Sequence, residues 1–434
     1  MTPHMVPAAL ALAACAPPPA VSDVAIEVHP EVETLLSVSW TQEVDASSAQ
    51  VEYALDGEPW RSTPARAVPA GPASELLLGL PADAEVRVRF AQQIDGEDMV
   101  ADEGWTGSTG SLPEDLPVPT LVAWDPELAA PEPYLLLTVG LSDWYAGPWW
   151  LLILDRQARV VWYRALPVGE TTVMSRVSAD GTHVTWGEAD WFETERSVIQ
   201  RSTLDDAWSE TVPAPGMAYT YDELPDGTLA YDAWDDQWVG LRTLAPDGTR
   251  TEVWDCLAWL PEDRERWNCG TNTVLWSPAR GTYTWSLYDL DTVLEVDPTR
   301  GVVGSWGDDG LDPIDAGLQL QHYPNWTAAG TLLLHTQDDG EKEVQWAREF
   351  AWDESTNALS EVWSYEADDR YADCSGEAVR LANGNTLINY GCGQAVREIA
   401  PDGITTWELN TGCLVGHQTL IADLYALNRG PAGE

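Results

Sequence analysis

Short runs of alternating hydrophobic and polar residues fill residues 22–110 and predict β-strands. The runs read VAIEV, LLSVSW, AQVEYAL, SELLLGL and EVRVRF. They recur about every ten residues, and the Gly, Pro and Asp residues between them mark turns. This spacing is typical of a small all-β sandwich, in which one face of each strand packs inward. We therefore expect a β-sandwich over residues 22–110.

A different pattern begins beyond residue 120, where one short phrase returns about every fifty residues. It reads ADGTHVTW, PDGTLAYD, ARGTYTWS, AAGTLLLH and ANGNTLIN, and a degenerate copy is expected near ELAAPEPYLLLT. Each phrase predicts a hairpin turn whose glycine adopts a positive φ angle. The five turn glycines are Gly181, Gly227, Gly281, Gly330 and Gly384.

A series of tryptophans supports the same repeat, because one is expected to close a later strand in each unit. The series is Trp162, Trp208, Trp254, Trp306, Trp363 and Trp407. Six units of four strands predict a six-bladed β-propeller over residues 121–428, with HQTLIADLYAL supplying a strand that closes the ring. The 24 Trp against three Phe could indicate an aromatic or carbohydrate ligand. Their periodic placement favours packing between blades.

The remaining segments complete the predicted organisation. Prolines in SLPEDLPVP indicate a linker over residues 111–120, and residues 429–434 are a tail. Residues 1–21 begin MTPHMVPAALALAAC and resemble a lipoprotein-type signal with a Pro-rich spacer, which implies lipidation at Cys15. The segment before the apolar run lacks Lys and Arg, and a disordered tail is the alternative. We expect an exported protein of the cell envelope or surface, lipid-anchored at Cys15.

The charge narrows the choice of partners. With 71 acidic and 22 basic residues, the formal net charge is −49. Such a surface repels nucleic acids and anionic headgroups. We therefore expect no nucleic-acid partner and no contact with a membrane except through a lipid anchor. No later run is apolar and long enough to span a membrane, and the oligomeric state stays open.

The cysteines predict disulfides rather than a metal site. In an oxidising compartment Cys256 and Cys269 could close one loop, and Cys374 and Cys392 could bracket a hairpin. Cys413 is then left over. No C-x-x-C pair is present, which argues against zinc. The acidic stretches 232–238 and 306–315 could bind Ca²⁺, but they lack the spacing of a calcium loop. We interpret them as solvated loops and expect no cofactor.

Chemistry in a propeller collects where the innermost strands line the central channel. Five positions are expected at one height there, each eight residues before a turn glycine: Val173, Tyr219, Thr273, His322 and Gly376. His322 is the only histidine of this level. His335, His183 and His417 are interpreted as satisfied core or surface residues, and the sequence suggests no carboxylate partner for the last two.

These residues resemble the arylsulfate sulfotransferase family of six-bladed propellers over roughly residues 121–428. The resemblance is strongest in CSGEAVRLANGNTLINYGCGQAVREIAPDGITTWEL, TNTVLWSPARGTYTWSLYDLDTVLEVDPTRGVVGSW and QHYPNWTAAGTLLL. It implies that a sulfuryl group passes between phenols through a covalently modified histidine, and His322 matches that position. The N-terminal runs LLSVSWT, VEYALDGEPW and LLLGLPADAEVRVRF resemble a fibronectin type III module with Trp40 in its core.

The helper residues of the family are mostly replaced. Its His-His-Asp phrase corresponds to Ala218, Tyr219 and Thr220. Its His-x-Asn phrase corresponds to Gly270, Thr271 and Asn272, so that only the asparagine remains. An expected arginine is Tyr288, and the Asp that follows Gln-His is Tyr323. A channel without these cationic groups is poorly suited to stabilising a sulfuryl transition state.

Three hypotheses follow. The first is a sulfotransferase-like enzyme with His322 as nucleophile. Its substrate contacts would be Asn272, Tyr219, Tyr288, Gln321 and Tyr323. The second is a catalytically degenerate lipoprotein that binds a small aromatic or sulfated molecule, or a surface protein partner. The third is a structural surface protein whose acidic exterior serves solubility.

Overall fold

The structure is a computed structural model. It describes residues 20–100, 104–140, 147–167, 169, 171–190, 193–235, 238–338, 344–367, 369–370 and 374–431. The chain divides into two compact units, with the boundary after Ser111. The expected lipidation site, Cys15, lies outside the described residues. Among the described residues, none of the helices is long and apolar enough to cross a membrane.

The N-terminal unit contains two antiparallel sheets. One sheet consists of β1 (Val21–Val28), β2 (Leu36–Gln42) and β6 (Gly71–Leu77). The other is built on β3 (Ala46–Leu55) and β7 (Glu85–Ile94), joined by β4 (Arg61–Ser62), β5 (Arg66–Val68), β8 (Glu97–Val100) and β9 (Trp105–Ser108). The predicted alternation is present, since Val86, Val88 and Phe90 of β7 are buried while the residues between them are not. Trp40 of β2 is buried with its ring centroid 5.0 Å from that of Phe90.

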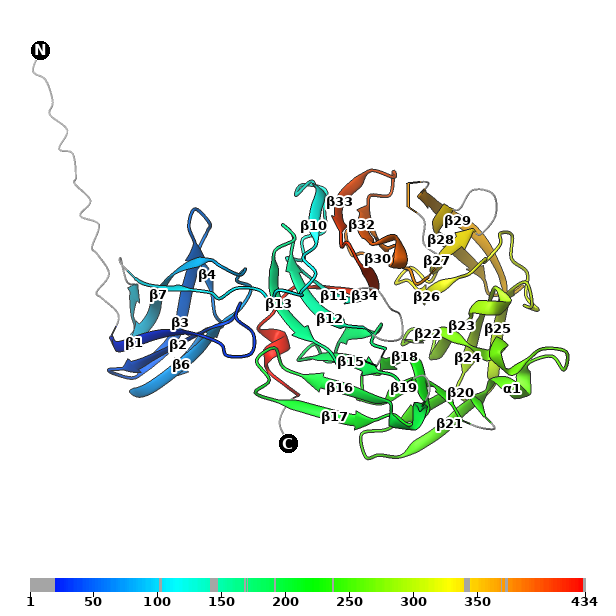
Figure 1. Ribbon diagram of the computed structural model, residues 1–434, viewed down its shortest axis with the longest axis horizontal. Helices are drawn as coiled ribbons and strands as arrows, with labels where there is room; N and C mark the ends of the chain where they lie inside the picture. Colours follow the sequence, from blue (N-terminus) through cyan, green and yellow to red (C-terminus); the bar gives the residue numbers. More distant parts are fainter. Residues whose placement is uncertain are drawn as a thin grey trace, which may run out of the picture. The chain divides into compact units, whose positions relative to one another are not determined.

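The second unit is an all-β, propeller-like assembly of antiparallel sheets that follow one another around a common centre (Figure 1). The first sheet pairs β34 (Leu414–Ile421) with β11 (Tyr134–Gly140), β12 (Trp149–Asp155) and β13 (Val160–Ala165). The second contains β14 (Ser175–Val177), β15 (Val184–Glu188), β16 (Val198–Ser202) and β17 (Ser209–Pro213). The third contains β18 (Met217–Glu223), β19 (Leu229–Trp234), β20 (Val239–Leu244) and β21 (Arg250–Asp255).

The later sheets repeat this order. The fourth contains β22 (Thr271–Ser277), β23 (Thr282–Leu287), β24 (Thr292–Asp297) and β25 (Gly301–Gly307). The fifth contains β26 (His322–Trp326), β27 (Leu332–Asp338), β28 (Val344–Asp353) and β29 (Ala358–Ala367). The sixth contains β30 (Glu377–Arg380), β31 (Thr386–Asn389), β32 (Ala395–Ile399) and β33 (Thr405–Asn410), with β10 (Thr120–Trp124) at its outer edge.

Short helices occupy some connections between strands. They are α1 (Cys256–Trp259) and the 3₁₀ turns η1 (Thr194–Arg196), η2 (Arg266–Cys269), η3 (Tyr288–Leu290), η4 (Gly391–Gly393) and η5 (Ala426–Asn428).

Both ends of the second unit pair with distant strands. The first strand, β10, pairs with β33, so that Leu121 lies opposite Leu409. The last strand, β34, pairs with β11, and Leu135 lies opposite Leu420. Strand β34 includes the HQTLI segment, from which the sequence predicted a strand after the last repeat. These contacts join the start of the unit to its end, because β10 covers the edge of β33 and β34 covers the edge of β11.

The predicted hairpin turns are confirmed. The glycines of the repeated phrase have positive φ angles of 71°, 80°, 68°, 79° and 91°. A side chain at such a φ is strained, which explains why glycine recurs at this point of each unit.

The tryptophan series is confirmed in five of its six members. These five lie in the strand at or next to the outer edge of their sheets: Trp162, Trp254, Trp306, Trp363 and Trp407. The expectation for Trp208 was wrong. It lies in the turn before β17, where its ring packs 4.9 Å from that of His183. The residues of β17 itself are exposed except for Val212, which is half-buried.

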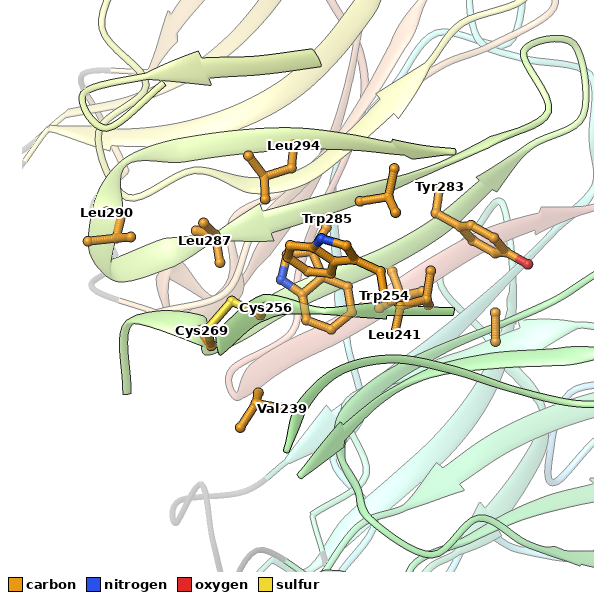
Figure 2. Packing of buried hydrophobic residues seen from close by; sticks show 13 residues of the cluster. Val239, Leu241, Trp254, Cys256, Cys269, Tyr283, Trp285, Leu287, Leu290 and Leu294 are labelled. Atoms are coloured by element: carbon orange, nitrogen blue, oxygen red, sulfur yellow. A yellow bond between two sulfur atoms is a disulfide. The ribbon is translucent and has the colours of Figure 1, made fainter. Parts of the chain in front are cut away.

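Tryptophans also pack between neighbouring sheets, as predicted. Trp254 of β21 meets Trp285 of β23 edge to face, with ring centroids 5.3 Å apart. Figure 2 shows these rings among aliphatic side chains from the third and fourth sheets. Burying such surface at about 25 cal/mol per Å² is the main force that holds adjacent sheets together.

Both predicted disulfides are present. Cys256 is bonded to Cys269, with Cα atoms 5.9 Å apart, and Cys374 to Cys392, with Cα atoms 5.5 Å apart. Cys413 is left over, as expected, and is free and buried. Burial raises the pKa of its thiol to about 11, so it is neutral and unreactive at physiological pH.

Candidate functional site

A cavity of about 260 Å³ opens at the ends of the innermost strands of the second unit. Its wall contains most of the positions singled out by comparison with the arylsulfate sulfotransferases. These are Ala218, Tyr219, Gly270, Thr271, Asn272, Tyr288 and His322. Strands β18, β22 and β26 bring most of them together from three sheets, while Gly270 directly follows η2 and Tyr288 begins η3. The sequence did not place the other wall residues at this site; they are Asp232, Trp234, Asp289, Cys374 and Ser375.

His322 lies at the start of β26 with 7% of its surface exposed. Its Nδ1 is 2.9 Å from the carbonyl oxygen of Leu320. Because a carbonyl only accepts hydrogen bonds, Nδ1 carries the proton and Nε2 keeps its lone pair. Burial lowers the pKa of His322 to about 4, so the ring is neutral at pH 7. Its edge packs against Tyr288, with ring centroids 5.1 Å apart.

Asp232 is the unexpected member of this wall. Its Oδ1 accepts hydrogen bonds from the backbone N–H groups of Tyr219, at 3.0 Å, and Thr220, at 2.8 Å. Its Oδ2 is buried and meets no hydrogen-bonding partner among the described residues. Burial raises the pKa of this carboxyl to about 8, which makes Asp232 a neutral acid at pH 7. Its Oδ2 can then donate a proton into the cavity.

The sequence contained a signal for Asp232 that we misread. The acidic stretch 232–238 was interpreted as a solvated loop, but Asp232 belongs to β19, whose residues 229–233 are all buried. A carboxyl inside a run that is hydrophobic on both faces is costly to bury, and such groups mark functional sites more often than surface loops do.

Aromatic rings form much of the remaining surface. Burial raises the pKa of Tyr219, and the nearby Asp232 adds to this effect, so its phenol stays protonated. Trp234, at the end of β19, is half-buried in the wall. Its ring centroid is 6.1 Å from that of Trp267 in η2, which is 68% exposed. The Cys256–Cys269 disulfide closes the loop that carries Trp267.

The wall of this cavity contains no Lys or Arg among the described residues. The one remaining charged group is Asp289, which is exposed at the mouth and whose pKa is raised by partial burial. A neutral imidazole, a neutral carboxyl and two phenols therefore define the interior.

The other predicted contact residues have structural roles as well. The Asn272 side chain donates to the carbonyl of Gln321 over 2.9 Å while lining the cavity. Gln321 itself is fully buried, lines none of the cavities described here, and donates to the carbonyls of Leu287 and Thr292. Tyr323 faces away from the 260 Å³ cavity and toward two others.

A constriction follows His322 along the centre of the unit. It is a space of about 10 Å³, room for a single water molecule at most. Four of the five positions predicted to share one height line it: Val173, Tyr219, His322 and Gly376. The fifth, Thr273, accepts a hydrogen bond from the backbone N–H of Tyr323 over 3.0 Å. The counting from the turn glycines is thus confirmed.

The interpretation of the other histidines needs two corrections. His322 is not the only histidine at this level, because His417 lines the same constriction. His417 also has a carboxylate neighbour, with Nδ1 3.0 Å from Oε2 of Glu377. His183 lies 3.9 Å from Asp180. The sequence missed the pair at His417 because β34 comes from the tail, where no turn glycine gives a position to count from.

Backbone strain gathers around His322. Leu320, Tyr323 and Ser375 have φ angles of 48°, 52° and 59°, in the left-handed region that side chains rarely occupy. Each lies beside or in the wall of the central cavities. Strained residues of this kind cost of order 1–3 kcal/mol each and cluster at functional sites.

Metal ligation finds no support in this geometry. Among the described residues, no group of three or more His, Cys, Asp or Glu could hold a metal ion. In the stretch 306–315, Asp309 pairs with Arg264, and Asp312 accepts a hydrogen bond from the backbone of Ser305. These carboxylates serve the loop itself.

Comparisons with known proteins leave the family open. No protein-family model and no curated protein matches the sequence. A solved protein of unknown function from Bacteroides caccae is 17% identical and covers 67% of this chain and 100% of its own, with a TM-score of 0.46. The C-terminal WD40 domain of Sif2 is 10% identical over 88% of this chain and 84% of its own, with a TM-score of 0.38. Similarities this low carry no argument about function.

Proposed function

We propose that the second unit is a closed six-bladed β-propeller whose 260 Å³ cavity binds a small, uncharged aromatic molecule that carries a hydroxyl group, such as a phenol. The proposal for the ring rests on six sheets in sequence order and on the pairing of β10 with β33 and of β34 with β11. The single observation that carries the ligand class is the neutral interior of the cavity, which has both a hydrogen-bond acceptor and a donor.

The acceptor and the donor match the two hydrogen-bonding roles of a hydroxyl group, which can both donate and accept. A phenolic O–H can donate to the lone pair on Nε2 of His322, while its oxygen accepts from the neutral carboxyl of Asp232. The rings of Tyr219, Tyr288 and Trp234 supply apolar surface for the aromatic part of the ligand.

An anionic ligand fits less well. Burying a sulfate ester would require a compensating positive charge, and the described wall offers none. A phenol needs no such compensation. The resemblance to arylsulfate sulfotransferases thus supports a shared position for the ligand's ring, whereas the neutral wall favours a binding protein over an active transferase.

Sulfuryl transfer remains the second candidate because two groups suit it. Nε2 of His322 is unprotonated and could attack sulfur, forming an N–S bond as the S–O bond to the phenol breaks. Asp232 could give its proton to the departing phenolate oxygen. What opposes this reaction is the lack of cationic donors for the sulfuryl oxygens.

The proposal extends to the cellular location of the protein and to the role of its N-terminal unit. We propose that the protein is exported and lipid-anchored at Cys15, with the N-terminal unit a fibronectin type III-like spacer. The two disulfides support an oxidising compartment.

Calorimetric titration with phenol and phenyl sulfate at about pH 6 tests the ligand class. We expect saturable binding of phenol and at least about tenfold weaker binding of phenyl sulfate, because the anion has no counter-charge. His322→Phe keeps a ring but removes the acceptor and should abolish phenol binding. His183→Phe, at a buried histidine outside this wall, is the matched control and should retain it. Phenyl sulfate binding as tightly as phenol would overturn the proposal.

The enzyme hypothesis has its own test. The protein is incubated with p-nitrophenyl sulfate and a phenol acceptor, beside the His322→Ala variant. Release of p-nitrophenol by the native chain alone would establish transfer through His322. Release by neither chain would retire the enzyme hypothesis.

A further inference from the structure

A second cavity, of about 460 Å³, lies beyond the constriction. Strands β14, β18, β30 and β34 contribute its wall, which shares no residue with the wall of the 260 Å³ cavity. Tyr323, Glu377 and His417 line both this cavity and the constriction. Because the constriction holds at most one water molecule, the two larger cavities cannot share an organic ligand.

Four buried polar atoms without a hydrogen-bonding partner among the described residues belong to residues that line this second cavity. They are Nη2 of Arg176, Oε1 of Glu377, Oε1 of Gln418 and Nδ1 of His417, of which the last lies 3.0 Å from Oε2 of Glu377. The side chains of Arg176, Glu377 and Gln418 are 9%, 1% and 2% exposed. Such groups are costly to bury unpaired, and their grouping around one space indicates a bound partner.

The rest of each charged side chain is held firmly. Arg176 donates from Nε to the carbonyl of Tyr221 over 3.0 Å and from Nη1 to the hydroxyl oxygen of Tyr323 over 3.1 Å. Glu377 accepts from the backbone N–H of Gln418 over 3.2 Å, and Nδ1 of His417 lies 3.0 Å from the same Oε2. Nε of Arg176 also lies 3.8 Å from Oδ1 of Asp222, so the guanidinium has a carboxylate neighbour while its Nη2 has no hydrogen-bonding partner among the described residues.

The other charged groups of this wall have partners of their own. Glu223 pairs with Arg201, and Arg380 pairs with Glu349. Asp222 accepts from the backbone N–H of Trp276 over 2.7 Å. Apart from Nδ1 of His417, which lies beside Glu377, the atoms without a hydrogen-bonding partner among the described residues of this wall are thus those of Arg176, Glu377 and Gln418.

Apolar residues lie toward the outer part of the same wall. Along β30 and just beyond it, Glu377 is buried while Val379 and Leu381 are half-buried. Along β34, His417 is buried and Leu420 is half-buried. The exposure rises along both strands away from the constriction, so these aliphatic side chains lie toward the mouth, where the half-buried Glu223 and Arg380 also lie.

We propose that this second cavity binds a free α-amino acid with an aliphatic side chain, in its zwitterionic form. The carboxylate accepts from Nη2 of Arg176, the ammonium group donates to Oε1 of Glu377 and of Gln418, and the side chain packs on Val379, Leu381 and Leu420. A ligand with both charges supplies a hydrogen-bonding partner to each of these three atoms and adds no net charge to the wall. This site is independent of the phenol site.

Three matched ligands test the proposal on the native chain: L-leucine, N-acetyl-L-leucine, which lacks the cation, and L-leucine methyl ester, which lacks the anion. In calorimetric titrations at about pH 6.5 we expect saturable binding of L-leucine and at least about tenfold weaker binding of each derivative, because each loses a charge-assisted hydrogen bond. No saturable binding of L-leucine up to about 20 mM would overturn the proposal and leave the cavity to water. Equal binding of either derivative would overturn it too.

A pair of variants locates the binding. Glu377→Gln should weaken L-leucine binding at least about tenfold and leave phenol binding unchanged. Glu295→Gln is the matched control, since Glu295 is also a buried carboxylate but pairs with Arg280 in the fourth sheet. It should change neither affinity by more than about twofold. If Glu377→Gln does not fold, titration of the native chain with the three ligands still tests the proposal. A lack of leucine binding would not affect the phenol proposal, which concerns the other cavity.

Discussion

Replacing Asp232 by Asn should make the protein more stable at alkaline pH and leave it almost unchanged at acidic pH. In the folded chain, burial raises the pKa of Asp232 to about 8, from the ordinary value of 3.8. Between these values the folded state holds a proton that the unfolded state has released. The stability of the native protein therefore falls as the pH rises from 4 to 8.

The size of the effect follows from the two pKa values. They differ by about four pH units, and each unit corresponds to 1.36 kcal/mol, so the cost at pH 8 or above is on the order of 5 kcal/mol. Asn keeps an oxygen that can accept from the backbone of Tyr219 and Thr220, and it cannot ionise. Asp232→Asn should therefore match the native protein near pH 4.5 and exceed it by several kcal/mol near pH 8.5.

Urea unfolding followed by tryptophan fluorescence measures this difference at a series of pH values. Asp263→Asn is the control, because it removes one negative charge from an exposed turn and should give a small difference at every pH. A difference for Asp232→Asn that stays constant from pH 4.5 to 8.5 would show that Asp232 is not a buried neutral acid. The donor assigned to the phenol cavity would then be lost as well.

Further outcomes are expected from other residues. Folding lowers the pKa of His322 from 6.5 to about 4, so the stability of the native protein should fall as the pH drops through this window. Gln does not titrate, so the destabilisation by His322→Gln should shrink by about 3 kcal/mol between pH 7 and pH 4 in urea titrations. A constant difference would contradict this. Removing the Cys256–Cys269 disulfide by a double substitution to Ser should cost about 3 kcal/mol. Once both proteins are reduced, which also opens Cys374–Cys392, they should unfold at the same urea concentration. Gly376→Ala places a Cβ 2.3 Å from Nδ1 of His335 and should lower the melting temperature far more than Gly403→Ala, which has a positive φ but open space; equal losses would refute the clash.

The sequence predicted those features that repeat. A turn glycine at a fixed place in each unit is required by a positive φ, so the hairpins and the level of Tyr219 and His322 could be counted from it. It also predicted both disulfides. The features that the sequence did not predict depend on contacts between residues of different sheets. The burial of Asp232 and the pair of His417 with Glu377 depend on which strands meet at the centre, and no local pattern encodes that meeting.

The exterior of this protein and its central cavities differ in charge. A chain with a formal charge of −49 repels anions over the range of the Debye length, about 8 Å at physiological salt, before any contact is made. Inside, burial has neutralised the groups that would otherwise carry charge at the phenol cavity, since Asp232 holds its proton and His322 lacks one. At the second cavity, Arg176 lies near Asp222, and Glu377 lies near His417. Both sites thus select ligands without net charge, which are the ligands that such an acidic surface does not repel.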